Sequence, residues 1–462
     1  MNQKITRVLC LLAISLCLFY PVARGQGPVF TRNQVVEDLN HYHKTLEEVH
    51  FNPWLHISRE TYLKKFDSLK AALPDTISAN ELLARLYPLS ALLKDGHAMP
   101  AIVQPVLRNE YGKKQFLPFV PEYDEKDRLY FPVGFAGKNQ LKPGARILSV
   151  NGLDMADFSR KIKRYHGGLD HYSREMSVKL LPLHLFLADI KAPFIIRYRE
   201  AKGRTRTLEL AEGITYAEAL SEGMPHIRDK AYSYKIIDNK LAYFNFKNMS
   251  GDWKVLGQFL DSLFTEIRTR KINILAVDLR QNSGGNSLLG DLLLSYLTRK
   301  PHAQMGTKFW KISQPYKEHL LKNGNNGHAY LQQPNGSTWE MGNCSSHEPM
   351  FRVDSIFEGR IYFITGAFTF SSANMLADAV KHYRIGTIIG EPTGESTNDF
   401  GETLNIELPA TKVRMQLTTS FEVGADCDQS HNKPVMPDIL IRNTIADKIA
   451  GRDPVLEYLR RL

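Results

Sequence analysis

The sequence predicts a multidomain α/β protein, and three features of its 462 residues indicate this fold class. Apolar residues at helical spacing dominate the region before residue 100, strand signals dominate the middle, and buried strands alternate with helices from about residue 230 onward. Such alternation is typical of a sheet covered by helices. We expect an N-terminal helical region over 26–100, a strand-rich module over 101–225 and an α/β core over 226–462.

The N-terminal segment 1–25 has the pattern of a secretory signal peptide. Lys4 and Arg7 precede an apolar run, 8-VLCLLAISLCLFY-20, and small residues then follow at positions suited to signal peptidase. The run is short for a membrane anchor, which needs ~20 apolar residues. We expect an exported protein, periplasmic or extracellular, whose mature chain has no membrane span.

Composition and charge exclude several classes of protein. Hydrophobic residues make up 43% and charged residues 23% of the chain, which argues against global disorder. The formal net charge is +10, but the chain has no dense Lys/Arg block, so we expect no nucleic-acid partner. After removal of the signal, Cys344 and Cys427 remain. They could form one disulfide or stay separate thiols, and they cannot make a cysteine-based zinc site.

Three amphipathic helices are predicted in the N-terminal region. The stretch 31-TRNQVVEDLNHYHKTLEEV-49 carries apolar residues at helical spacing. The starts of the second and third helices carry capping signals, which are Ser58 and the pair Ser78 and Glu81. The third helix is expected to kink at Pro88 and to end at 94-KDGHAMP-100, where Gly96 fits a helix C-terminal position.

The middle of the chain contains a segment that resembles the core of a PDZ domain. In 142-KPGARILSVNGLDMADF-158, a Pro-Gly turn, an apolar strand and an Asn-Gly turn precede a helix. PDZ modules bind peptides by adding a strand to a sheet edge. We predict a PDZ-like module over 101–225, which either binds peptides or is a scaffold that binds nothing.

Strands and helices alternate in the C-terminal half. Strands are expected at 240–246, 272–279, 361–365 and 386–390, and helices at 252–269, 286–298 and 372–383. The segment 321–349 is rich in Asn, Gly, Gln and Ser, and predicts a long surface loop.

Two strand-to-helix junctions carry residues that could do chemistry. In 276-AVDLRQNSGGNSLLGDLLL-294, Gly284 and Gly285 allow a tight turn before a helix. Backbone N–H groups at a helix start suit the oxyanion of acyl transfer, although a simple connecting turn has the same pattern. In 368-FTFSSANML-376, Ser371 and Ser372 open a helix, where a serine serves either as a nucleophile or as an N-cap.

These junctions, in this order, resemble the C-terminal processing (tail-specific) peptidases of family S41 and their tricorn-type relatives. The matching segments are 93-LKDGHA-98, 276-AVDLRQNSGG-285, 369-TFSSAN-374, 387-TIIGEPTG-394 and 435-VMPDI-439. The resemblance covers nearly all of the mature chain. It implies a ClpP/crotonase-like α/β serine protease core over 226–462, a peptide or unfolded protein substrate, and no metal or organic cofactor.

The resemblance assigns roles to the residues of the two junctions. Ser371 takes the position of the nucleophile, and Ser372 would supply its backbone N–H to the oxyanion. Gly284 or Gly285 would be the second donor. Where the family has an acidic residue three positions after the nucleophile, this chain has Asn374.

The same comparison selects a histidine as the general base. One branch of the family places a lysine 25 positions after the nucleophile and a glutamine four positions later. Here those positions are Ser396 and Phe400. The tricorn-like branch uses a histidine from the N-terminal part, and His97 matches that position. Histidine, with an ordinary pKa near ~6.5, suits proton transfer at neutral pH.

The sequence therefore predicts an exported serine endopeptidase that works through an acyl-enzyme, with Ser371 as nucleophile and His97 as general base. The group that orients His97 stays open among four candidates, which are Asp95, Asp426, Asp428 and His431. The alternative function is a catalytically inactive relative that binds peptides or another ligand. The substitutions at Asn374, Ser396, Phe400 and His431 favour that alternative.

Overall fold

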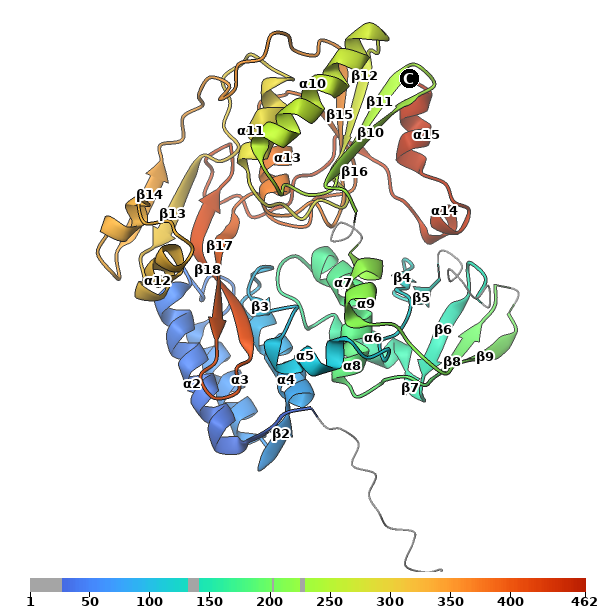
Figure 1. Cartoon of the computed structure of the whole chain (residues 1–462), viewed down its shortest axis with the longest axis vertical. Helices are drawn as coiled ribbons and strands as arrows, with labels where there is room; N and C mark the ends of the chain where they lie inside the picture. Colours follow the sequence, from blue (N-terminus) through green and yellow to red (C-terminus); the bar gives the residue numbers. More distant parts are fainter. Residues whose placement is uncertain (1–26, 132–140, 202, 225–228) are drawn as a thin grey trace, which may run out of the picture.

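The computed structural model describes residues 27–131, 141–201, 203–224 and 229–462, so the predicted signal segment lies outside the described residues. Its parts follow one another along the chain as N-terminal helices, a central module with its own sheet, and a C-terminal α/β domain (Figure 1). In Figure 1 the C-terminal domain lies above the other two parts, which sit side by side. The mixed α/β class predicted from the sequence is confirmed.

The N-terminal region forms the helices expected there. Its elements are β1 (Val29–Thr31), α2 (Arg32–Val49), α3 (Arg59–Ala71), β2 (Thr76–Ser78) and α4 (Ala79–Ala91). The Ser58 side chain accepts from the Thr61 N–H, and Ser78 with Glu81 forms the predicted capping box. The apolar stripe of α2 is fully buried, in a core that this region shares with the central module and with strands of the C-terminal half.

The end of α4 differs from the prediction. Lys94, with φ of 57°, adopts the left-handed conformation after the helix, whereas Gly96 does not. A Cβ at Gly96 would lie 2.7 Å from Cζ of Phe370, so glycine is required there by close packing. The prediction that Gly96 ends the helix is therefore wrong. Glycine is needed at this position because of its contact with Phe370, which is distant in sequence.

The central module is built around one sheet. Its strands run in the order β4-β5-β6-β8-β9, with β7 paired to β6. The strand bounds are β4 (Glu122–Tyr123), β5 (Leu129–Tyr130), β6 (Arg146–Val150), β7 (Leu153–Asp154), β8 (Phe194–Arg199) and β9 (Thr205–Leu210). The helices are α5 (Arg108–Tyr111), α6 (Met155–Ile162), α7 (Asp170–Lys179), α8 (Leu181–Leu187) and α9 (Tyr216–Gly223). Asn151 and Gly152 form the predicted turn, both with positive φ.

The C-terminal domain centres on a six-stranded sheet in the order β10-β11-β12-β15-β16-β19, parallel except for β10. Its strands are β10 (Tyr232–Ile237), β11 (Leu241–Phe246), β12 (Ile274–Asp278), β15 (Arg360–Thr365), β16 (Thr387–Gly390) and β19 (Ile439–Leu440). One face is covered by α10 (Trp253–Thr269), α11 (Leu288–Ser295) and α13 (Ser372–His382), and the other by α15 (Pro454–Arg460), which follows α14 (Ile445–Ile449). The strands and helices predicted for this half are confirmed.

A second sheet joins the C-terminal domain to the N-terminal helices. It runs β14-β13-β18-β17, and β3 (Met99–Pro100) pairs with β18. The other strands are β13 (Thr307–Lys311), β14 (Thr338–Gly342), β17 (Asp399–Glu407) and β18 (Arg414–Val423). Since β3 begins two residues after His97, this sheet fixes where the histidine lies.

The segment 321–349 is not the uninterrupted loop that its composition predicts. It contains the end of α12 (Gln314–Lys322) and all of β14, which pairs with β13. Trp339 of β14 stacks on Trp310 of β13, with ring centroids 5.3 Å apart. Beyond β14, Cys344 forms a disulfide with Cys427, with Cα atoms 5.8 Å apart. Within the described ranges, no helix is both long and apolar enough for a membrane crossing.

Candidate active site

Asn282 joins the two strand-to-helix junctions. It lies in the turn after β12 and is fully buried. Its backbone carbonyl accepts from the Phe370 N–H at 3.1 Å, and its side-chain oxygen accepts from the Gly284 N–H at 2.9 Å. Its amide donates to the Phe246 carbonyl at 2.9 Å. The glycine turn and the serine turn are therefore held against each other by one residue.

Ser371 occupies the N-cap position of α13 but does not behave as a cap. Its φ is 53° and its ψ is −131°, whereas a capping serine has extended dihedrals. Its side chain accepts no capping hydrogen bond. A non-glycine residue in this region stores about 1–3 kcal/mol of strain and is typical of functional sites. The simple-cap interpretation of Ser371 therefore fails, and its hydroxyl is left for another purpose.

Free backbone donors lie beside Ser371. Ser372 is the first residue of α13, and its Oγ donates to the Gly285 carbonyl at 2.7 Å. Within the described part of the chain, the N–H groups of Ser372 and Gly285 have no acceptor. The Gly284 N–H, by contrast, already donates to Asn282. Of the donors suggested by the sequence, Gly285 and Ser372 are thus the ones available to an oxyanion.

Gly284 is required by its contact with Ser371. Its φ is 93°, and an added Cβ would lie 2.7 Å from the Ser371 Cβ and 2.8 Å from the Ser372 nitrogen. The absence of a side chain therefore allows the two turns to approach each other.

His97 stands at the end of the N-terminal region, where its backbone is bound by the buried carboxylate of Asp95. The Asp95 Oδ1 accepts from the His97 backbone N–H at 2.7 Å. Asp95 is also held by His50 at 3.2 Å and by Thr418 at 2.6 Å. Because the His50 Nδ1 accepts from the Asn52 N–H, its Nε2 must carry the proton donated to Asp95. Asp95 thus fixes the backbone of His97.

Glu395 brings His97 and Ser371 together. Its Oε2 accepts from the Ser371 N–H at 2.6 Å, and its Oε1 lies 3.3 Å from the His97 Nδ1. The side chain of Glu395 is 4% exposed. The Oε1 and Nδ1 atoms are both buried and are not aligned for a hydrogen bond.

Comparisons with known proteins assign the part of the chain that carries Ser371 and Glu395. Residues 240–441 match the family model described as Peptidase family S41. This segment is similar to peptidase family S41. The predicted enzyme class, a serine-type peptidase, is confirmed at this level. No curated protein matches the sequence of the whole chain.

Solved structures extend the likeness beyond the S41 segment. The crystal structure of mature CPAF is 16% identical with a TM-score of 0.63, and the match covers 93% of this chain and 97% of that chain. Mature CPAF complexed with lactacystin matches with the same identity and coverages and a TM-score of 0.62. The photosystem II D1 C-terminal processing protease is 14% identical, covering 89% and 93% of the two chains, with a TM-score of 0.44. At these identities the CPAF matches show a shared fold.

Burial and charge shift the proton affinities in the S41 site. Burial lowers the pKa of His97, although Asp95, Glu422 and Glu402 oppose this. Burial and the nearby Asp399 raise the pKa of Glu395 well above its usual range. In both groups burial disfavours the charged form.

The positions that distinguish the branches of the family have structural roles here. The Asn374 amide donates to the Ser396 carbonyl at 2.7 Å, and its buried Oδ1 has no partner within the described ranges. Phe400 is buried and packs its ring on His50, with centroids 4.5 Å apart. Phe400 therefore covers the histidine that holds Asp95.

Three of the four candidates for orienting His97 are engaged with other groups. His431 Nδ1 lies 2.7 Å from Asp426, and Asp428 accepts from Ser430. Asp95 is the fourth, but its Oδ1 is 3.8 Å from the His97 Nδ1, farther than Glu395. Glu395 was missed because counting 25 positions from the serine ends on its neighbour Ser396. Its place in 393-TGES-396 was the available signal.

No group of three metal-ligating side chains occurs among the residues that the structure describes.

Proposed function

We propose that this protein is an exported serine endopeptidase with a Ser371–His97–Glu395 catalytic triad. The observation that carries the proposal is the Glu395 carboxylate, which contacts the Ser371 N–H and faces the His97 Nδ1. A third group that holds the base in one tautomer is what a serine nucleophile requires.

In the proposed mechanism, the Ser371 Oγ attacks the carbonyl carbon of the scissile peptide bond while the His97 Nε2 takes its proton. Glu395 stabilises the resulting imidazolium through Nδ1. The oxyanion accepts hydrogen bonds from the N–H groups of Ser372 and Gly285. The C–N bond then breaks as His97 returns the proton to the leaving amine, and water hydrolyses the ester by the reverse sequence.

The use of histidine instead of lysine is part of this proposal. Ser396 stands at the lysine position of the other branch, and no lysine contacts Glu395 or Ser371 among the described residues. The substrates are proposed to be peptides or unfolded polypeptides. Export is supported by the signal-peptide pattern and by the Cys344–Cys427 disulfide, because such bonds persist in oxidising compartments.

A fluorophosphonate probe tests the proposal, since it labels serines that an adjacent base has activated. The wild-type protein is expected to label, and the Ser371→Ala variant is expected to lose labelling. His97→Ala should label at least about 10²-fold more slowly, which is the contribution of a general base. Ser372→Ala is the matched control and should keep most of its labelling, because its Oγ only donates to Gly285.

Two outcomes would contradict the proposed function. A folded wild-type protein that does not label would favour the inactive, ligand-binding alternative. Labelling lost in Ser372→Ala but kept in Ser371→Ala would move the nucleophile by one residue.

A further inference from the structure

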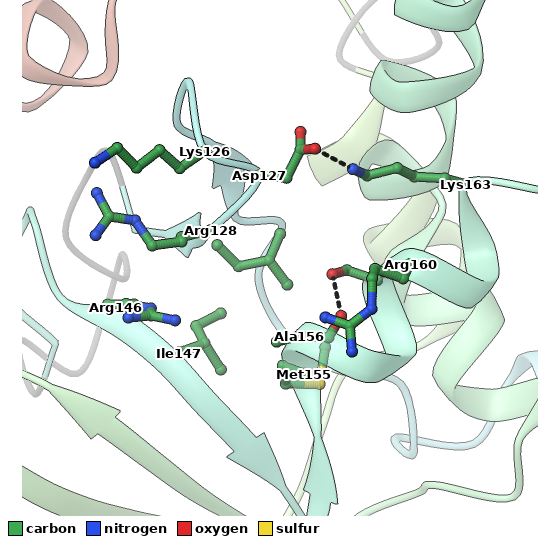
Figure 2. Close-up of a pocket in the computed structure, with 11 residues that line it drawn as sticks. Lys126, Asp127, Arg128, Arg146, Ile147, Met155, Ala156, Arg160 and Lys163 are labelled. Atoms are coloured by element: carbon green, nitrogen blue, oxygen red, sulfur yellow. Dashed lines mark hydrogen bonds and ion pairs between the residues drawn. The ribbon is translucent and has the colours of Figure 1, made fainter.

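The central module contains a cationic pocket far along the chain from Ser371. The pocket has a volume of about 320 Å³ and lies between the turn that leads into β5, the start of β6, and α6. Five cationic side chains line it, and they are Lys126, Arg128, Arg146, Arg160 and Lys163. Figure 2 shows the first three on one wall and the last two on the helix that faces them. The lining contains one acidic residue, Asp127.

Three of the five cations are already neutralised. Lys163 lies 2.5 Å from Asp127, as Figure 2 shows, and Arg128 lies 2.5 Å from the buried Asp124. Arg160 pairs with Asp157 one helical turn away. These ion pairs hold three of the five cationic side chains in place around the pocket, and they do not neutralise the other two.

Lys126 and Arg146 have no carboxylate partner among the described residues. The residues outside the described ranges contain no Asp or Glu, so they cannot supply one. Among the residues that the structure describes, the buried Nε of Arg146 also has no hydrogen-bond acceptor. A buried guanidinium donor without an acceptor is unfavourable, and a bound anion would supply the missing acceptor.

The pocket also has an apolar component. Leu129, Ile147 and Met155 line it between the cations, and all three are buried. This combination suits a ligand that carries both carboxylates and methylene groups, such as a glutamate-rich segment of a polypeptide. A pocket of this volume holds a few side chains, in the lower part of the usual range for ligand sites.

The sheet geometry indicates how such a ligand would be held. β5 pairs with β4 on one side and with β6 on the other, so this strand has no free edge beside the pocket. A peptide therefore could not add a strand to β5, and recognition has to come from side chains.

We propose that this pocket binds acidic side chains of a polypeptide, with Lys126 and Arg146 as the residues that pair with its carboxylates. The site is separate from the serine, histidine and glutamate of the S41 site. It would select or retain acidic protein segments, and its binding is measurable whether or not the protein cleaves peptides.

Fluorescence anisotropy with labelled peptides tests this proposal. The protein carries Ser371→Ala so that no probe is cleaved. The first probe is a glutamate-rich peptide with an amidated C-terminus, and the second has glutamine in place of every glutamate. The third is the glutamine peptide with a free C-terminal carboxylate, which separates side-chain recognition from terminal recognition.

The glutamate probe is expected to bind, and its affinity should fall as salt is added because the contacts are partly exposed ion pairs. Lys126→Gln and Arg146→Gln should each weaken its Kd about tenfold, or ~1.4 kcal/mol. Lys126 is exposed, so its variant tests the site even if the Arg146 variant fails to fold. Lys161→Gln is the matched control, because Lys161 is an exposed cation of α6 outside the pocket lining.

Equal binding of the glutamate and glutamine probes would overturn the proposal. So would unchanged binding in Lys126→Gln, or binding of the third probe alone. A wild-type protein that is not labelled by the fluorophosphonate would instead contradict the proposed peptidase and would leave the peptide-binding result unaffected.

Discussion

At the scale of single residues, Glu395 is the group on which the proposed chemistry depends. It is buried, it accepts from the Ser371 N–H, and its other oxygen faces His97 at 3.3 Å. A carboxylate in this place does two things at once. It holds Ser371 in a strained conformation through a charge-assisted hydrogen bond, and it offers Nδ1 of the base a partner.

Glu395→Gln is expected to lower kcat by roughly 10²- to 10⁴-fold while KM changes little, because the amide cannot stabilise the imidazolium. Glu395→Asp keeps the charge and should retain part of the activity. Steady-state kinetics on a peptide substrate measures both. A Glu395→Gln variant as active as the wild type would remove this residue from the mechanism.

The loss of activity at low pH should also be caused by protonation of the Glu395–His97 pair. The base accepts a proton only when His97 is neutral and Glu395 is ionised. Burial and Asp399 raise the pKa of Glu395, so activity should be lost on acidification at a higher pH than an ordinary carboxylate would give.

In Glu395→Gln only His97 is left to titrate, and burial lowers its pKa. The pH at which activity falls on acidification is therefore expected to be lower in this variant, below ~6.5. A pH profile of kcat/KM for the wild type and this variant measures the shift. If this pH is unchanged or higher in the variant, the loss of activity is not controlled by the Glu395–His97 pair.

At the scale of structural elements, the site consists of two turns in close contact. The glycine turn after β12 and the serine turn before α13 share Asn282 and leave no room for a Cβ at Gly284. Since β12 and β15 are neighbouring parallel strands, the turns that follow them lie at the same end of the sheet.

Gly284→Ala is therefore expected to displace Ser371 and to cost at least about 10²-fold in kcat/KM, since small misplacements have effects of that size. Its positive φ adds about 1–3 kcal/mol of destabilisation. Gly257→Ala in α10 is the control. Its nearest contact would be an ordinary 3.9 Å, and it should stabilise the helix by about 0.5–1 kcal/mol. Kinetics and thermal unfolding compare the two, and equal behaviour would refute the packing argument.

The elements that the sequence predicted well are those with a local signal. α2 and α10 have clear helical periodicity, and β12 and β15 are apolar runs bounded by turns. The strand β14 was not predicted, because its Trp339 stacks on Trp310, a residue distant in sequence. The fixed distance from Ser371 likewise led to Ser396 instead of Glu395. Gly284 was proposed as a donor because no local pattern reveals that Asn282 accepts its N–H.

At the scale of the whole molecule, the site is divided between distant parts of the chain. Ser371 and Glu395 come from the C-terminal domain, whereas His97 follows the N-terminal helices. The β17–β18 hairpin joins them. Gln416 and Thr418 of β18 donate to the His97 carbonyl and to Asp95. The tip of the hairpin is held by Asp38 of α2, which accepts from the N–H groups of Ala410 and Thr411.

Asp38→Ala tests this connection, because Asp38 is 1% exposed and its loss leaves two backbone donors without an acceptor. We expect the free energy of unfolding to fall by about 1–3 kcal/mol, and Asp38→Asn to lose less since it keeps an acceptor. Glu37→Ala removes an adjacent, exposed charge of the same helix and should stay within about 0.5 kcal/mol of the wild type. Urea unfolding measures the differences. If the Asp38 and Glu37 variants unfold alike, the hairpin is held by its strand pairing with β3 instead, and His97 does not depend on the contact with α2.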